Sequence, residues 1–584
     1  MPSEKDLREL QQLTDALANG RSNPELVLAR ARKLRSMGYD DLAVADAYYA
    51  LTLVEADDPD FSDLRIDRPD DPVPIKSDAL FLLQESLREL GCLQDACTFH
   101  MQLRELIHAE PRIAWGVSGF PLIDKYHQLR PNAKKVEDFS QFLQIRQTLP
   151  NQGLAYRIVY PWNLYEPNRT SNESLAEINN KLQAAAPSLE ARATELPVLG
   201  AIGNADAPVT NIQLGLFANT DLEPSSTILR ERSIITAIHP IDASLCDLCA
   251  SPLPDLTSST PPVACPECST TVFCSEACLD FALKMYHKPP FCGNDDGLDE
   301  IGRDANAPYP AEDLYFLLVA RTIAMAEAQD VHPLELFETK YLCGEFTEPP
   351  VQRDRPLVEP VWPGEKDKYK EWVDEVQRSK TLPFSFMHNV VLPFRFFITL
   401  MLSDESLTPY SSKWIERYDH WIIQTLYAKF RGVASANQST WDAKPEVAAV
   451  HPLWCLANHS CNPNVRWQWG GHAQESEIRY IVRDALVWQD PSKAAGEYAG
   501  FKKEVDEDHT HIKADVPEYT SIKKGEYIGI KKDEEIMNHY VDIDLMVKER
   551  REYAMGPLGG ECRCERCVWE ANEMKVKMAN YWDY

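Results

Sequence analysis

Residues 458–464 read Asn458-His459-Ser460-Cys461-Asn462-Pro463-Asn464. This stretch is too polar for a core strand and too specific for an arbitrary loop. Asn458 and His459 can each form several directed hydrogen bonds, Asn462-Pro463 is a turn pair, and the thiol of Cys461 can serve as a metal ligand. The stretch therefore predicts a functional site.

A second cysteine cluster lies further along the chain. Cys562, Cys564 and Cys567 have Cys-x-Cys-x2-Cys spacing, which is one ligand short of the four that a tetrahedral zinc ion takes. Cys461 would supply the fourth ligand, so we expect one zinc ion to hold two distant segments together. Between these segments, a β-type run in residues 533–540 ends at Tyr540.

The middle of the chain carries a denser group of ligands. Its members are Cys246, Cys249, Cys265, Cys268, Cys274, Cys278, His287 and Cys292. Eight such ligands suffice for two closed four-coordinate zinc sites with no open position, so we expect both ions to be structural. Because the amino terminus has no apolar signal region, this spacing favours zinc over a disulfide framework.

Together these features resemble the SET-domain protein lysine methyltransferases, whose signatures are an NHSxxPN segment, a GEExxxxY segment and a cysteine-rich tail. Residues 458–464, 533–540 and 562–567 match them in order. Residues 215–231 are similar to the family's opening segment, and the eight-ligand cluster resembles a MYND zinc finger. The chain is thus similar to SET-and-MYND proteins over roughly residues 205–570.

The resemblance implies a pairing of the metal ligands, because the ligands of a MYND finger alternate between its two ions. One ion takes Cys246, Cys249, Cys274 and Cys278, and the other takes Cys265, Cys268, His287 and Cys292. With the site at Cys461, Cys562, Cys564 and Cys567, three structural zinc ions are expected.

The resemblance also implies a cofactor, S-adenosylmethionine, and the residues that would bind it. The matching positions are Gly215, Asn437, Asn458 and His459. Tyr540 matches the catalytic tyrosine that orients the lysine amine and polarises the methyl group. A buried structural tyrosine is the alternative interpretation of Tyr540.

The sequence departs from the family pattern in three segments. Gln213 replaces the first glycine of the opening Gly-x-Gly, and Asp533 replaces the glycine of the GEE segment. Before the last cysteines, Leu558 and Gly560 stand where the family has two aromatic residues that line the lysine channel and pack against adenine. Tyr553 and Trp569 are candidates to compensate for that loss.

The periodicity of the sequence indicates an α+β fold. Apolar spacing near 3.6 predicts helices at residues 24–34, 42–54, 80–90, 93–107 and 312–329, and apolar runs predict helices at 382–402 and 414–430. Gly38 and Gly91 each precede a helix, which is typical of tetratricopeptide repeats, although a generic helical bundle is equally consistent. Residues 349–375 and 489–520 are expected to form a connection and a surface insertion.

These patterns predict five segments. Residues 1–200 are helical, 201–245 begin the SET domain, 246–292 form the MYND-type finger, 293–545 hold a helical insertion and the catalytic part, and 546–584 form the zinc-binding tail.

The composition limits the partners. The chain has 584 residues, and its 90 acidic and 60 basic residues give a formal charge of −30. Such a surface repels nucleic acid and favours basic partners, so we expect no direct nucleic acid binding.

The longest apolar run, residues 390–402, is interrupted by Pro393 and Arg395, so no membrane span is expected. The interpretation is a cytoplasmic or nuclear protein.

The leading hypothesis is therefore a protein lysine methyltransferase that uses S-adenosylmethionine and acts on a histone or another basic protein with an accessible lysine. Its finger and helical segment would bind peptide partners. The alternative is a catalytically weak or inactive SET/MYND adaptor that binds protein partners. Retention of Asn458, His459 and Tyr540 favours the enzyme, and the loss of the tail aromatics favours the adaptor.

Overall fold

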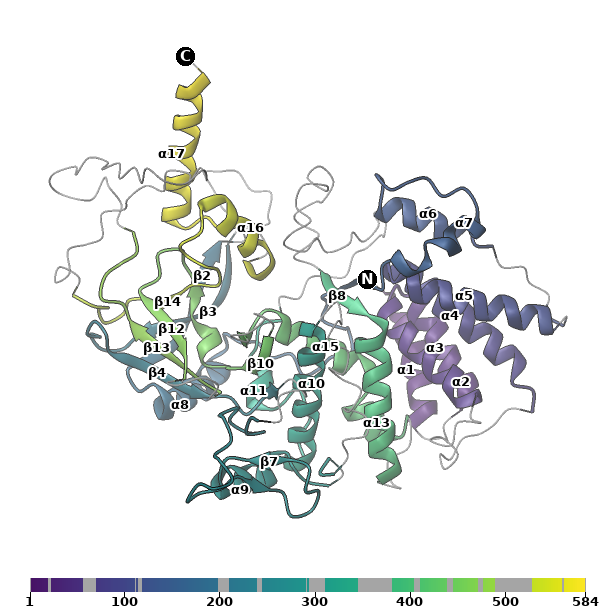
Figure 1. Cartoon of the computed structure of the whole chain (residues 1–584), viewed down its shortest axis with the longest axis horizontal. Coiled ribbons are helices and arrows are strands. Elements are labelled where there is room, and N and C mark those ends of the chain that lie inside the picture. The colour runs from purple at the N-terminus through teal and green to yellow at the C-terminus, as the bar shows by residue number, and fades with distance from the viewer. Residues whose placement is uncertain are drawn as a thin grey trace. The chain divides into compact units, whose positions relative to one another are not determined.

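The computed structural model combines helices and strands in two compact units (Figure 1). The first unit contains residues 1–166, 234–373 and 380–450, and the second contains 167–233, 374–379 and 451–584. Each unit is thus assembled from segments that are distant in the sequence. The residues that the structure describes are 2–18, 23–55, 70–110, 112–113, 118–197, 210–238, 244–289, 291–293, 310–344, 381–403, 410–438, 445–470, 476–488, 528–558 and 561–582.

The first unit begins with helices that pack in chain order, α1 on α2, α2 on α3, α3 on α4 and α4 on α5. Figure 1 shows α2 to α5 side by side. The packing follows the apolar spacing, since α2 buries Val27, Leu28, Ala31 and Leu34. The helices are α1 (Glu4–Ala18), α2 (Pro24–Ser36), α3 (Asp40–Val54), α4 (Val73–Leu90), α5 (Leu93–Ala109), α6 (Phe120–Leu129), α7 (Phe139–Gln144) and the 3₁₀ turn η2 (Arg146–Thr148).

Two glycines separate helices in this series. Gly38 has φ of 88° and precedes α3, and Gly91 has φ of 98° and closes α4 before α5 begins. This left-handed conformation strains any residue with a Cβ, so glycine is the favoured residue at both turns. The helices predicted from periodicity between residues 24 and 107 are confirmed.

Helices from the later part of the chain complete the core of the first unit. They are α9 (Glu276–Met285), α10 (Pro310–Gln329), α11 (Phe337–Lys340), the π turn η3 (Met387–Val391), α13 (Leu392–Ser403), α14 (Ser412–Arg417) and α15 (His420–Arg431). α15 and η3 both contact α3. The buried Tyr49 stacks on Phe394 at 4.2 Å between ring centroids. Segments more than three hundred residues apart in the sequence therefore share one core.

Two of the predicted helices differ in the structure. Residues 381–385 form β8 (Thr381–Ser385), which pairs antiparallel with β1 (Gln152–Tyr156), so the helix predicted at 382–402 begins later. The helix predicted at 414–430 is divided at Asp419, whose side chain caps α15. The other strands of this unit are β5 (Thr236–Ile238), β10 (Pro445–Val450) and β9 (Ala434–Gln438), in that order in one sheet, and the hairpin of β6 (Val263–Ala264) and β7 (Val272–Phe273).

The second unit contains several small sheets. β2 (Leu189–Pro197) pairs antiparallel with β3 (Thr210–Ala218), and β4 (Thr227–Arg232) lies beside β13 (Glu477–Val482), which pairs with β12 (Val465–Trp469). β11 (Asn458–His459) and β14 (Met537–Asn538) form a short parallel pair. The helices and turns are α8 (Asn172–Ala185), the 3₁₀ turn η4 (Trp454–Leu456), α16 (Val547–Leu558) and α17 (Glu565–Trp582).

The observed division of the chain differs from the five predicted segments. α8 and β2 precede residue 200 and belong to the second unit, because β2 pairs with β3 along its whole length. The helices of residues 310–431 belong instead to the first unit. The connection predicted at 349–375 and the insertion predicted at 489–520 lie outside the described residues. No helix in the described part of the chain is long and apolar enough to cross a membrane.

Candidate functional site

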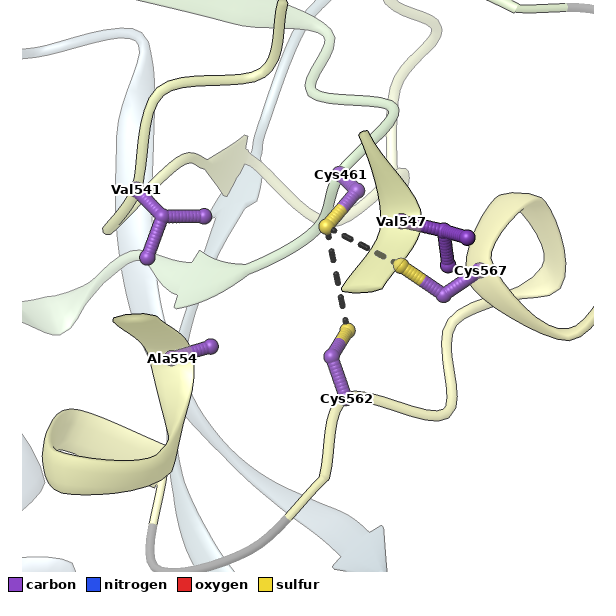
Figure 2. Close-up of a cluster of buried hydrophobic side chains, with 6 residues drawn as sticks. All are labelled: Cys461, Val541, Val547, Ala554, Cys562 and Cys567. Carbon is purple, nitrogen blue, oxygen red and sulfur yellow. Dashed lines mark hydrogen bonds between the residues drawn. The ribbon is translucent and has the colours of Figure 1, made fainter. Parts of the chain in front are cut away.

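Four cysteines of the second unit meet at one point, which we call the four-cysteine site. The ligand atoms of Cys461, Cys562, Cys564 and Cys567 all lie within 4.8 Å of one another. The Sγ atom of Cys461 is 3.9 Å from that of Cys562 and 3.4 Å from that of Cys567, as Figure 2 shows. Zinc–sulfur bonds of about 2.3 Å place the sulfurs of a tetrahedral site about 3.8 Å apart. The arrangement therefore fits a zinc ion held by four thiolates.

Arginines surround the four-cysteine site. The buried guanidinium of Arg550 donates to the Sγ of Cys567 and to Glu570, and Arg566 donates to the backbone carbonyl of Cys461 at 2.8 Å. Arg551 donates to the carbonyls of Cys562 and Cys567. Four thiolates around Zn²⁺ carry a net charge of −2, so these guanidinium groups compensate the charge of a buried site.

Residues 246–292 form two further ligand groups in the first unit, and we refer to this segment as the finger. Its groups are Cys246, Cys249, Cys274, Cys278 and Cys265, Cys268, His287, Cys292. The structure thus brings together the same sets that the alternating pairing assigns. The β6–β7 hairpin and α9, which Ser275 caps at its amino end, hold these ligands in place.

The finger is fixed to α10 through Asp247. The Tyr286 hydroxyl donates to the Asp247 carboxylate at 2.6 Å, and Arg321 of α10 donates to the same carboxylate at 2.9 Å. The Arg321 guanidinium also lies 3.7 Å over the ring of Tyr286. With four ligands at each metal group, the finger offers metal sites suited to structure rather than catalysis.

Asn458 connects three segments of the second unit. Its Nδ2 atom donates to the carbonyl of Leu214 at 3.0 Å and to Oε1 of Glu535 at 2.7 Å. Asn464 reinforces this junction, because its side chain donates to the carbonyl of Glu535 and accepts from the backbone N–H of Met537. These bonds align β11 with β14. Burial raises the pKa of the Glu535 carboxyl, and the bond from Asn458 opposes that shift.

Gly215 lies against the same carboxylate. A Cβ atom at residue 215 would come within 2.8 Å of Oε1 of Glu535 and 2.9 Å of Cγ2 of Thr194. Only glycine therefore allows β3 to approach the 534–538 segment at this point. The second glycine of the opening segment thus has a steric role even though Gln213 replaces the first.

His459 links Tyr540 to the four-cysteine site. The backbone N–H of Tyr540 donates to Nδ1 of His459 at 3.0 Å, so the ring carries its proton on Nε2, which lies 3.4 Å from the Sγ of Cys461. Burial lowers the pKa of His459 to about 4, so the imidazole is neutral at physiological pH. One side chain therefore joins the metal ligand to Tyr540.

Tyr540 itself is partly exposed. Its hydroxyl donates to the carbonyl of Ala457 at 2.9 Å, and its ring lies 5.2 Å from that of His459. The side chain is 36% exposed, which disagrees with the alternative of a buried structural tyrosine. A hydroxyl that donates to a carbonyl keeps its own lone pairs available as acceptors.

Asn437 belongs to the first unit. It is a residue of β9, where its backbone pairs with Val447 of β10. Gly215, Asn458, His459 and Tyr540 are all residues of the second unit. The structure therefore brings four of the five predicted cofactor and catalytic residues into one unit.

Sequence reasoning missed an aromatic group in the second unit. Trp454 stacks on Tyr480 at 6.3 Å and meets Trp467 edge-on at 5.8 Å, and Trp467 stacks on His539, the neighbour of Tyr540. Trp467 and Trp469 are two residues apart in β12, so their side chains lie on the same face of the strand. This spacing is the signal that could have identified the group.

The two candidates to replace the missing tail aromatics differ in their surroundings. Trp569 packs 6.1 Å from Trp488, whereas Tyr553 is 43% exposed. Leu558 packs against the hydrophobic cluster that includes Cys461. Gly560 lies outside the described residues. Trp569 is therefore tied to a structural contact.

The chain has no match among protein-family models and none among curated proteins. Its function must therefore be argued from its own residues.

Proposed function

We propose that this chain is a protein lysine methyltransferase that uses S-adenosylmethionine. The observation that carries the proposal is the junction of residues 458–459 with 535–540, where Asn458 binds Glu535 and Tyr540 binds His459. These residues belong to the segments that resemble the NHSxxPN and GEExxxxY signatures.

In this proposal, Gly215, Asn458 and His459 hold the cofactor. When bound, S-adenosylmethionine supplies a methyl group on a sulfonium, which the lysine amine takes up as the carbon–sulfur bond breaks. The protein needs no catalytic metal for such a transfer. Its task is to position the amine, and correct positioning contributes several kcal/mol.

Tyr540 would position the amine. Because its hydroxyl donates to the carbonyl of Ala457, its lone pairs can accept a hydrogen bond from the lysine nitrogen. The neutral imidazole of His459 holds the backbone of Tyr540, and water would carry away the proton that the lysine releases. The three zinc ions would have structural roles, and the negative net charge of the chain would favour a basic protein substrate.

Calorimetric binding of S-adenosylmethionine to the zinc-loaded full chain tests the proposal. We expect saturable binding that Asn458→Ala abolishes, because this substitution removes the side-chain bonds from residue 458 to Leu214 and Glu535. Asn219→Ala is the matched control, since the Asn219 side chain donates only to the exposed carbonyl of Pro187 in the same unit. Absence of binding by a protein that retains its zinc and melts cooperatively would overturn the proposal.

A second experiment isolates Tyr540. Tyr540→Phe is expected to bind the cofactor normally but to lose methyl transfer to a histone mixture by about a hundredfold or more, which is typical of a group that acts in the transition state. Tyr156→Phe, at a tyrosine of β1 in the first unit, should retain the wild-type rate.

The alternative is a SET/MYND adaptor that binds protein partners and has little or no activity. One observation favours it: the tail position of Leu558 holds an aliphatic side chain packed in the hydrophobic cluster around Cys461. If the chain is an adaptor, the finger and the helices α1 to α5 would bind the partners. Cofactor binding without transfer to any basic protein would support this alternative.

A further inference from the structure

A cavity lies in the first unit, whereas the residues proposed for methyl transfer belong to the second. Its volume is about 260 Å³, and it is lined by α1, α2, α3, the residues after β1 and the region where α14 meets α15. The function proposed above gives it no role. Its lining combines charged, aromatic and aliphatic side chains, which is typical of a ligand site.

Carboxylates outnumber cations in the cavity wall. Arg30 donates to both oxygens of Asp46 at 2.7 and 2.8 Å and to both oxygens of Asp419 at 3.0 Å. One guanidinium therefore serves two carboxylates, and Arg30 and Asp46 are almost completely buried. Glu416, an exposed residue, adds a third carboxylate to the lining. An excess of negative charge beside a cavity favours a cationic ligand.

His420 lines the same cavity and adds no positive charge to it. Its Nε2 atom accepts from the side-chain amide of Gln424 at 2.9 Å, and the Oε1 atom of Gln424 accepts from Asn389. The proton of the neutral ring is therefore on Nδ1, which is buried and has no hydrogen-bond partner within the described residues. Burial lowers the pKa of His420 to about 3, so the ring is neutral at physiological pH.

Aromatic rings complete the wall. Trp162, Tyr165 and Trp421 line the cavity together with aliphatic side chains of the amino-terminal helices. Tyr165 and Trp421 are both stacked on His332, with centroid distances of 3.6 and 6.4 Å. These contacts hold the two rings in place. Aromatic faces attract alkylammonium groups, and the attraction increases when the cation is desolvated.

We propose that this cavity binds an organic ammonium group. The excess carboxylates and the aromatic rings receive the ammonium. Two sources share this chemistry: a free amino alcohol such as choline, and the methylated lysine side chain of a peptide. The inference does not depend on methyl transfer, because every residue in it belongs to the first unit.

Three probes test the proposal on the zinc-loaded full chain. They are choline, its uncharged isostere 3,3-dimethylbutan-1-ol, and N-acetyl-trimethyllysine methylamide. Choline and the isostere each give one nine-proton NMR signal, so saturation-transfer titrations compare them directly. We expect the isostere to bind about tenfold more weakly than choline or the peptide probe.

Two variants locate the site. Asp419→Asn is expected to weaken the binding of the cationic probes about tenfold and to leave the isostere unchanged, while an asparagine can still cap α15. Glu416→Gln changes an exposed residue that the fold does not need, and it should weaken the binding of the cationic probes about twofold. Glu105→Gln, at an exposed position of α5, is the matched control and should change nothing.

The outcomes distinguish the two ligand sources from each other and from a failure of the proposal. Binding of choline alone identifies a free amino alcohol, and binding of the lysine probe alone identifies a peptide side chain, and both support the ammonium site. Equal binding of choline and its isostere would overturn the proposal, because the cavity would then select only for apolar shape. Absence of binding by all three probes at millimolar concentration would also overturn it.

Discussion

The finger and the four-cysteine site are both built from groups of four metal ligands, but the chain loops between their ligands differ greatly in length. In the finger, the sulfurs of Cys265 and Cys292 are 3.6 Å apart and separated by 27 residues in sequence. At the four-cysteine site, the sulfurs of Cys461 and Cys567 are 3.4 Å apart and separated by 106 residues. A fourfold longer loop costs about 1.2 kcal/mol more to close.

The difference indicates two structural roles for zinc. The ligands of the finger lie in one continuous segment, so a metal there organises local structure. The four-cysteine site joins residue 461, next to His459 and Tyr540, to the segment that leads into α17. Removal of metal from the finger should therefore disrupt only the finger. Removal of metal from the four-cysteine site should disrupt structure throughout the second unit.

Cysteine substitutions should have the largest effects and should differ most between the finger and the four-cysteine site. Cys567→Ser removes a ligand of the long-range site, and because structural zinc contributes on the order of 10 kcal/mol to such folds, the second unit should lose its cooperative melt. Cys278→Ser should release one zinc ion and raise hydrogen exchange only in residues 246–292. Zinc content and hydrogen exchange measure both effects.

Cys343→Ser, at a cysteine outside all three ligand groups, is the control and should retain every zinc ion. If Cys567→Ser leaves residues 458–464 as protected as in the wild type, the long-range role of the four-cysteine site is wrong.

Substitution of a buried arginine tests the four-cysteine site without removing a metal ligand. Arg550→Met removes the guanidinium that donates to Cys567 and Glu570. Arg566 still donates to Glu570 at 2.7 Å, so we expect a loss of about 1–3 kcal/mol, as for a buried group that loses one hydrogen-bond partner. Urea unfolding of the second unit should show this loss. Arg563→Met, at an exposed arginine, should leave the midpoint unchanged, and equal midpoints for the two variants would contradict the assigned charge compensation.

Gly215→Ala should have a comparable effect on the second unit. The added Cβ would meet Glu535, Phe217 and Thr194, and overpacking of this kind costs about 1–3 kcal/mol. The loss should appear as a lower urea midpoint. Thr194→Ala combined with Gly215→Ala relieves one contact and should recover part of the stability; a double variant no more stable than the single one would assign the strain to Glu535 and Phe217.

The smallest effect is expected in the finger. Ser275→Ala removes the oxygen that caps α9 through the N–H of Cys278, a loss of about 1 kcal/mol. Hydrogen exchange should rise in α9 and stay constant in the second unit. Ser259→Ala, at an exposed serine of the same segment, is the comparison, and a response in residues 533–541 would show that the finger is not a local unit.

The sequence predicts the local features of this fold well. Ligand spacing identifies the clusters at 246–292 and 562–567, and apolar periodicity identifies the helices from α2 to α5, because both signals lie within short segments. The pairing of the eight ligands in the finger follows from the family resemblance, and Cys461 follows from the four ligands that zinc takes. Residues 458–464 and 533–540 are also predicted to form one site, since the resemblance relates them.

Long-range pairing could not be predicted. The sequence places β8 within a helix, because its apolar run is ambiguous until β1, more than two hundred residues earlier, supplies its partner. Asp419 divides a predicted helix: its side chain caps α15 and also binds Arg30, 389 residues away. The bond of Asn458 to Glu535 likewise depends on a parallel pairing that no local signal encodes.

The 106-residue interval between Cys461 and Cys567 also sets an order of events during protein synthesis. At roughly 5–20 residues per second, the ribosome adds Cys567 about 5–20 s after Cys461. The finger can acquire its zinc ions before residue 461 is translated. The second unit must keep Cys461 reduced and free of other metals until its remaining ligands emerge, so newly made chains depend on the thiol-protecting and metal-buffering capacity of the cell for that interval.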